Sequence, residues 1–291
     1  MSAQFLQFLF AGLTVGAIYA LAGLGYALVY SASGVINFAQ GQFVMLGAMA
    51  TVGLLGAGLP YFAAVPVAII ITIVVGMLAE KLAVRPAHGS SIVTLIVITL
   101  GVGELIKGSV QVVLDRSTHT LPSIGGGGTV DIAGAFISTQ GLWVIGVTFL
   151  CVLLVGYFLN STLTGKAMRA VSCNRLAAQL VGIKPDRMLL MSFAISAALG
   201  AIGGILITPI SFISYDSGTM IGLKGFVAAA LGGLGNAPGA IVGGLVLGLL
   251  ESFTAGYISS AYKDAVAFIL IILVFFVTPN GLFGAKSSER V

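Results

Sequence analysis

Few side chains in this sequence could do chemistry, and those few stand apart from one another. His88 and His119 occupy separate predicted loops, and neither has a second metal ligand at a useful spacing. The glycine run from Gly125 to Gly128 is not followed by the Lys-Ser/Thr pair of a phosphate-binding loop. No Ser/His/Asp, Cys/His or paired-carboxylate arrangement is recognisable in the sequence. We therefore predict no catalytic site and no metal site.

The composition explains this scarcity, because it is typical of a protein embedded in a membrane. Of the 291 residues, 58% are hydrophobic and only 8% are charged, and the mean hydropathy is +1.13. A soluble domain carries roughly a quarter charged residues. The net charge of +4 lies in short loops, which is typical of cytoplasmic loops rather than of nucleic-acid binding. Cys151 and Cys173 offer no disulfide framework.

The apolar runs predict an all-α polytopic helical bundle of about eight spans, forming a single transmembrane domain over 1–291. Each whole span is near the ~20 residues that cross the hydrocarbon core. The predicted spans are 5–30, 40–58, 62–83, 91–113, 141–159, 188–208, a broken stretch at 224–256, and 265–283.

Basic residues in the short loops predict the orientation, because cytoplasmic loops are enriched in Lys and Arg. The loop 114–140 falls outside, where Arg116 is its only base, and its stretch "TVDIAGAFIST" predicts a small hairpin. The regions predicted to be cytoplasmic are the end of the third span with Lys81 and Arg85, the segment 160–187, and the tail with Lys286 and Arg290.

The stretch 224–256 predicts two shorter helices, joined near the membrane midplane or forming a re-entrant pair. Pro238 removes a helix hydrogen-bond donor, and the glycines around it weaken a continuous helix. A re-entrant pair is favoured, because it returns the chain to the outside and lets the last span end in the cytoplasm. Asn236, between these helices, is a candidate residue of the substrate pathway.

The segment 33–43, "SGVINFAQGQF", is polar but carries no charge, although it lies between two long apolar runs. A solvent-exposed turn would more often carry Lys, Asp or Glu. Polar backbone at membrane depth persists only when protein buries it or when it lines a wet cavity. We predict that this segment is the polar start of the second span and that Asn37, Gln40 and Gln42 face the substrate pathway. Helix packing by Asn37 and Gln40 is the alternative.

Ionisable residues inside the predicted spans are scarce, which argues against an ion-coupled carrier. Glu104 is the best placed of them, three residues before Lys107, and the pair is predicted to neutralise itself on one helix face. Glycines at four-residue spacing, such as Gly12 and Gly16, predict close approach of helix backbones.

The segment 164–188 is polar and cytoplasmic in the predicted topology. From Lys166 to Val181 nothing breaks a helix, and alanines and valines share one arc at 100° per residue. Gly182 is predicted to end this helix, and Pro185 prevents its continuation. A short amphipathic helix of this kind suits either the membrane surface or a groove on a partner protein, and its mostly alanine face favours tight docking.

Over nearly its whole length the chain resembles the membrane permeases of branched-chain amino acid ABC importers, the LivH type. Four ordered blocks carry the resemblance, which makes it more specific than any single motif. The blocks are "GLTVGAIYALAGLGYALVY" with "GVINFAQGQF", "GKAMRAVSCNRLAAQLVGI", "KGFVAAALGGLGNAPGAIVGGLVLGLLE" and "YKDAVAFILIILVFFVTPNGLFG".

The resemblance implies a multi-pass permease of the bacterial inner membrane that binds no cofactor itself. It implies a second, similar permease subunit (heterodimer or homodimer), two cytosolic ABC ATPases that hold ATP and magnesium, and an external solute-binding protein. It also makes the cytosolic helix a coupling helix for the ATPases. The coupling residues implied are Lys166, Arg169, Arg175, Ala177, Ala178 and Gly182.

Two departures from the family pattern stand in these motifs. Leu176 occupies the position at which the importer coupling loop has an acid. Gln40 and Gln42 stand where the family commonly has a histidine and a glutamate, so recognition at this segment would use neutral hydrogen bonds. A pH-gated step through this segment is therefore not expected.

The expected function is transport of branched-chain amino acids (Leu, Ile or Val) by ATP-driven alternating access. The same family with urea, a short amide or another amino acid as cargo is the alternative. A stand-alone channel or ion-coupled carrier is a more remote one, and such a protein would not need the helix within 164–188.

Overall fold

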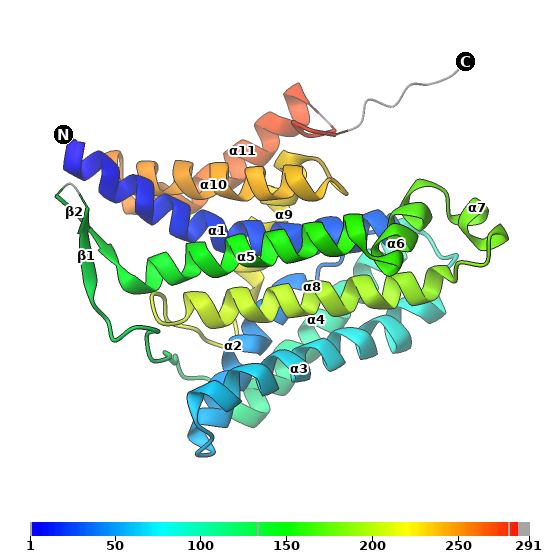
Figure 1. Ribbon diagram of the computed structural model, residues 1–291, viewed down its shortest axis with the longest axis horizontal. Coiled ribbons are helices and arrows are strands. Elements are labelled where there is room, and N and C mark those ends of the chain that lie inside the picture. Colours follow the sequence, from blue (N-terminus) through cyan, green and yellow to red (C-terminus); the bar gives the residue numbers. More distant parts are fainter. Residues whose placement is uncertain (1, 133, 279, 285–291) are drawn as a thin grey trace.

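Helices make up most of the computed structural model, which describes residues 2–132, 134–278 and 280–284 (Figure 1). The described residues also contain two short strands, β1 (Thr129–Ile132) and β2 (Ala135–Ser138), a π-helical turn at Glu80–Val84, and 3-10 turns at Arg85–Ala87 and Ser260–Tyr262. The α-helices are α1 (Ser2–Ser33), α2 (Gln40–Gly56), α3 (Tyr61–Ala79), α4 (Ile92–Leu114), α5 (Thr139–Ser161), α6 (Leu163–Cys173), α7 (Arg175–Leu180), α8 (Pro185–Ile207), α9 (Ser217–Gly232), α10 (Ala237–Tyr257) and α11 (Lys263–Val277).

The predicted polytopic helical fold is confirmed. Seven described helices, counting short turns continuous with them, are long and apolar enough to cross a membrane, and α2 and α9 are shorter apolar helices. The broken stretch is indeed two helices, α9 and α10, but α9 begins at Ser217, earlier than 224. The last helix ends at Val277 rather than near 283, because Thr278 leaves the helical conformation.

The bundle has two distinct ends, which we name by their contents. The basic end carries α6 and α7, and Arg85 lies there because its guanidinium approaches the Asp186 carbonyl oxygen at 3.5 Å. The hairpin end carries β1 and β2, which pair antiparallel from Thr129 opposite Ser138, so the predicted hairpin is confirmed. Figure 1 shows these ends at opposite extremes of the bundle. Lys286 and Arg290 lie outside the described residues.

The helices α1–α4 and α8–α11 are arranged as an inverted repeat. α1 runs from the hairpin end to the basic end and packs against α9 and α10, whereas α8 runs the opposite way and packs against α2 and α3. The second helices of the two halves, α2 and α9, contact each other. Repeats of this kind are common in transporters, whose binding sites lie near the membrane midplane at the repeat interface.

Small residues allow a close contact between α1 and α10. A Cβ atom added to Gly12 would lie 2.8 Å from the Leu249 Cα, and one added to Gly16 would lie 2.9 Å from the Leu245 Cα. Such distances leave no room for a side chain. The close approach predicted from the glycine spacing is therefore confirmed.

Candidate functional site

Most of the segment 33–43 lies within the bundle, with only Gly34 fully exposed. α1 ends at Ser33, residues 34–39 are not helical, and α2 begins at Gln40. The Gln40 amide donates to the Ser196 carbonyl oxygen at 3.1 Å and accepts from the Ser196 hydroxyl. Because Ser196 lies midway along α8, this irregular backbone reaches the middle of the bundle. Side chains supply hydrogen bonds that a helix would otherwise provide there, since the Phe38 amide donates to the Thr99 hydroxyl at 3.3 Å.

The three predicted pathway residues of this segment differ in their surroundings. Gln40 is completely buried with both amide atoms bonded, which favours the packing alternative for this residue. The Asn37 oxygen accepts from the Ala39 amide at 3.2 Å, while its nitrogen is buried without a partner in the described structure. Gln42 donates to the Thr219 hydroxyl at 3.3 Å, and its buried oxygen likewise has no partner there. Asn37 and Gln42 therefore each have one side-chain atom that could still form a hydrogen bond.

The fourth predicted pathway residue, Asn236, lies elsewhere, at the basic end. It joins α9 to α10, where its oxygen accepts from the Gly239 amide at 3.0 Å and so caps α10. Its nitrogen donates to the Phe283 carbonyl oxygen at 2.8 Å. The neighbouring Gly235 packs against Tyr30, near the end of α1. The α9–α10 connection is therefore near the basic end, so of the two predicted arrangements the junction near the midplane is wrong. The favoured arrangement, a pair that returns the chain to the outer side, agrees with Tyr257 at the end of α10, which packs against Phe8 near the start of α1.

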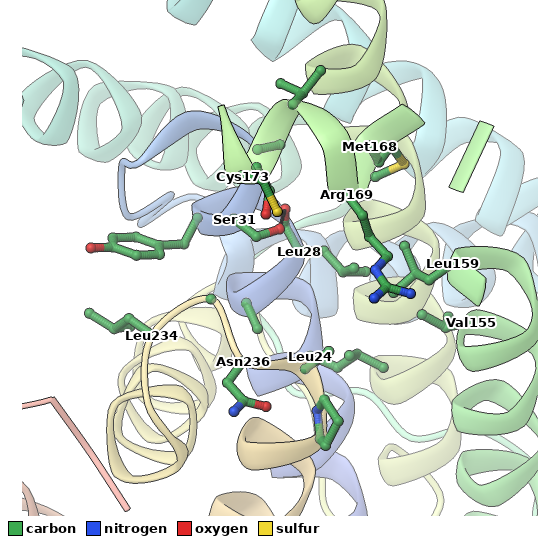
Figure 2. Close-up of a pocket in the computed structure, with 18 of the residues that line it drawn as sticks. Leu24, Leu28, Ser31, Val155, Leu159, Met168, Arg169, Cys173, Leu234 and Asn236 are labelled. Atoms are coloured by element: carbon green, nitrogen blue, oxygen red, sulfur yellow. Dashed lines mark hydrogen bonds between the residues drawn. The ribbon is translucent and has the colours of Figure 1, made fainter. Parts of the chain in front are cut away.

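Asn236 lines a cavity of about 1090 Å³. Its walls are formed by α1, α5, α6 and the α9–α10 connection. Figure 2 shows apolar side chains from α1 and α5, among them Leu24 and Val155, and polar groups from α6 on the other side. Arg169 extends from α6 and donates to the Asn160 oxygen at 2.6 Å. The cavity therefore combines an apolar wall with a basic, hydrogen-bonding rim at the basic end.

The predicted coupling helix is not continuous. It consists of α6 and α7, separated at Asn174, whose backbone is extended at φ −157° and ψ 105°. The Asn174 oxygen accepts from the Ala177 amide at 2.9 Å, so this residue caps α7 instead of continuing α6. Asparagine readily forms such a cap because its side chain competes with the helical backbone bonds. The expectation that nothing breaks this helix is wrong, whereas its end at Gly182 is confirmed by a φ of +86°.

The implied coupling residues of this segment divide into buried and exposed groups. Ala178 is buried, whereas Lys166, Ala177 and Gly182 are exposed. Arg175 forms an ion pair with Asp186 at 3.1 Å. The side of α7 that faces away from the bundle presents Leu176 and Leu180, which are 73% and 88% exposed. This small apolar surface projects from the basic end.

The interior of the bundle contains an ion network that the sequence did not lead us to predict. Lys224 on α9 lies 2.6 Å from a carboxylate oxygen of Glu251 on α10 and 2.6 Å from one of Asp264 on α11. The Tyr19 hydroxyl donates to the other Glu251 oxygen at 2.8 Å. A lysine within the apolar sequence "GLKGFVAAAL" was the available signal. The predicted partner of Lys107 is also wrong, because its ammonium pairs with Asp216 and not with Glu104.

The comparisons with known proteins agree with this architecture. The family model described as "Branched-chain amino acid transport system / permease component" matches residues 8–275. The high-affinity branched-chain amino acid transport system permease protein LivH of Salmonella typhimurium is 36% identical, covering 100% of both chains. The permease protein BraD of Pseudomonas aeruginosa is 34% identical, covering 99% of this chain and 98% of its own.

A solved structure, PsaBC from Streptococcus pneumoniae in complex with Fab, contains a chain of similar fold. The TM-score is 0.53 at 14% sequence identity, and the match covers 96% of this chain and 97% of that one. At this identity the likeness concerns the fold alone. The family match and the full-length relatives establish the classification: the chain belongs to the family of permease components of branched-chain amino acid transport systems.

Proposed function

We propose that this chain is the transmembrane permease subunit of an ABC importer for branched-chain amino acids in a bacterial inner membrane. The observation that carries the proposal is the α6–α7 segment, which places an apolar surface at the basic end beside a large cavity. A permease needs such a surface to receive movement from its ATPases. ATP and magnesium would be bound by these partner subunits.

The α7 surface is the proposed ATPase contact. Leu176 and Leu180 are exposed apolar side chains of the kind that fill a groove on a partner. Where the importer coupling loop has an acid, Leu176 would make an apolar contact instead. The basic side chains Lys166 and Arg175 lie on the same segment and would face the polar rim of that contact. A second homologous permease and an external solute-binding protein complete the proposed importer.

The cavity is proposed as the cytoplasmic part of the pathway in one state of an alternating-access cycle. Because α6 forms one wall, a movement of α6–α7 with the ATPases would change the access of solvent to the cavity. Cys173 is exposed and lines this wall, whereas Cys151 is buried in α5. The two native thiols therefore form a matched pair of reporters.

Thiol labelling tests the alternating-access part of the proposal. In the assembled transporter, a water-soluble maleimide should modify Cys173 at a rate that changes when a non-hydrolysable ATP analogue binds. The Cys151 thiol should remain slow in both conditions. Equal rates at Cys173 with and without nucleotide would contradict a movement of this wall.

Uptake by the complete transporter tests the cargo. Radiolabelled leucine should accumulate in an ATP-dependent manner, and unlabelled isoleucine and valine should compete. ATP-dependent uptake of radiolabelled urea or of a short amide, without uptake of leucine, would favour the alternative cargo. Flux through liposomes containing this chain alone would favour a channel.

A substitution on α7 tests the coupling surface. Leu180→Asp should reduce uptake at least about tenfold without unfolding the permease, because this side chain contacts no core. Ala178 is unsuitable, since it is buried and a bulky substitution would disturb packing. Lys184→Met, at an exposed position beyond α7, is the control for altered surface charge. Normal uptake by Leu180→Asp would exclude α7 as the contact.

A further inference from the structure

The helices α2 and α9 both begin partway along the bundle, and their first turns meet there. At 17 and 16 residues they are about 25 Å long, short of the ~30 Å hydrocarbon core. A Cβ atom on Gly41 would lie 2.1 Å from the Gly218 carbonyl oxygen, so the two backbones are in contact. The hydrogen bond from Gln42 to Thr219 joins the same two turns. The positive ends of two helix dipoles therefore lie close together at this level of the bundle.

A notch of about 70 Å³ opens where α4 passes this junction. Its level is the middle of the bundle, because Gly103 lies midway along α4 and packs beside Gln42. We name it the midplane notch, and the residues used below are Phe38, Gln42, Leu100, Glu104, Thr219 and Leu223.

Glu104 makes the midplane notch unusual. Its side chain is exposed at the middle of α4. It lies on an apolar face of this helix, because the neighbouring Leu100 and Leu105 are also exposed, at 49% and 72%. A carboxylate at this depth is unfavourable against lipid and marks a protein contact or a wet pathway. Within the described residues no salt bridge involves Glu104, since Lys107 pairs with Asp216. Its carboxylate therefore remains available to a ligand or to a neighbouring subunit.

Gln42 supplies a second acceptor at the same place. The residue is only 5% exposed, and its side-chain oxygen has no hydrogen-bond partner in the described structure. Leaving a buried acceptor without a hydrogen bond is unfavourable, so a ligand that donates to it is stabilised. Two acceptors, one of them charged, suit an ammonium group, while a first-turn amide of α9 suits a carboxylate.

We propose that the midplane notch binds the zwitterionic head group of an α-amino acid during transport. Glu104 and the Gln42 oxygen accept hydrogen bonds from the substrate ammonium, and the Gly218 amide, the first-turn amide of α9 that has no hydrogen bond among the described residues, receives its carboxylate. Phe38, Leu100 and Leu223 form the apolar wall beside the head group. This inference rests on the proposed function and names the chemical class that the pathway recognises.

The size of the notch determines what else the site needs. About 70 Å³ is small beside the roughly 300–1,000 Å³ pockets that enclose drug-sized ligands. The notch therefore holds the head group, and the aliphatic side chain extends beyond it. The exposed face of α4 lies there, so the second permease subunit would complete the site. An uncharged cargo such as urea would not pair fully with the Glu104 carboxylate or with the Gly218 amide.

Ligand binding to the purified permease pair with its ATPases, without the solute-binding protein, tests the proposal. The probes are leucine, 4-methylpentanoate (which lacks the ammonium) and 3-methylbutylamine (which lacks the carboxylate). Leucine should bind, and each analogue should bind at least about tenfold more weakly. Glu104→Gln should weaken leucine binding at least about tenfold, which corresponds to about 1.4 kcal/mol. Asp131→Asn, which removes a carboxylate from the hairpin instead, should change nothing.

Further variants keep the test decisive if Glu104→Gln fails to assemble. Glu104→Asp retains the charge and should retain part of the affinity, and Gln42→Met removes the acceptor while keeping the side-chain length. Unchanged leucine affinity in Gln42→Met and in an assembled Glu104→Gln would overturn the proposal that the midplane notch binds the head group. Leucine uptake by the wild-type transporter would still support the proposed function in that case. Absence of branched-chain amino acid uptake by the wild-type transporter would overturn the proposed function itself.

Discussion

Removing the ammonium of Lys224 should destabilise the permease more than removing any of the exposed charges. The side chains of Lys224 and Glu251 are only 8% and 9% exposed, whereas Asp264 is 44% exposed. Lys224→Met preserves most of the side-chain length and removes the charge. It leaves the Glu251 carboxylate buried without a counter-ion, held by the Tyr19 hydroxyl alone.

The burial of each partner sets the expected magnitude. Removing one member of a buried ion pair costs about 3–5 kcal/mol, because the other charge remains desolvated and unpaired. A half-exposed pair contributes about 0–1 kcal/mol, so Asp264→Asn should cost no more than about 1 kcal/mol. The double variant Lys224→Met/Glu251→Gln removes the stranded charge and keeps a hydrogen-bond acceptor for Tyr19. It should therefore recover most of the loss.

Unfolding by SDS in mixed micelles, followed by far-UV circular dichroism, measures these differences. Lys166→Met, at an exposed position on α6, is the matched control for loss of a lysine charge and should unfold like the wild type. The reasoning is refuted if Lys224→Met is as stable as Lys166→Met. It is also refuted if the double variant is less stable than Lys224→Met, because then the unpaired carboxylate is not the cause.

Three smaller effects follow from local geometry. Gly16→Val should destabilise the bundle by about 1–3 kcal/mol, measured by the same unfolding titration, because its Cβ would lie 2.9 Å from the Leu245 Cα; unchanged stability would contradict the α1–α10 contact. Gly182→Ala should cost about 1–2 kcal/mol at a φ of +86°, seen as faster proteolysis at the end of α7, and equal proteolysis would contradict this strain. Burial, assisted by the nearby Arg175, lowers the pKa of His88, so the unfolded chain binds the proton first and stability should fall as the pH drops below about 6.5. His88→Asn should reduce that slope, and an identical slope in the variant would exclude His88 as its source.

The family resemblance and the element types could be predicted from local features of the sequence. Long apolar runs specify spanning helices wherever they occur, and the hairpin required only a short alternating segment with a turn residue. The end of α7 was equally local, since Gly182 adopts a conformation that other residues disfavour. The prediction of one continuous helix from Lys166 to Val181 failed at Asn174. Helical periodicity did not reveal that this asparagine, in the middle of the segment, would cap a second helix.

The candidate sites depended on contacts between distant parts of the chain. The sequence alone identified Asn37, Gln40 and Gln42 as polar groups at membrane depth, because composition and hydropathy are sufficient for that prediction. Only the tertiary structure separated their surroundings, since Gln40 is bonded to Ser196, 156 positions away, whereas the Gln42 oxygen has no partner among the described residues. The same holds for Glu104, whose expected partner Lys107 is paired with Asp216 instead. Hydrophobicity determines which segments enter the membrane, but the packing of one repeat against the other determines which polar groups remain free to meet a substrate.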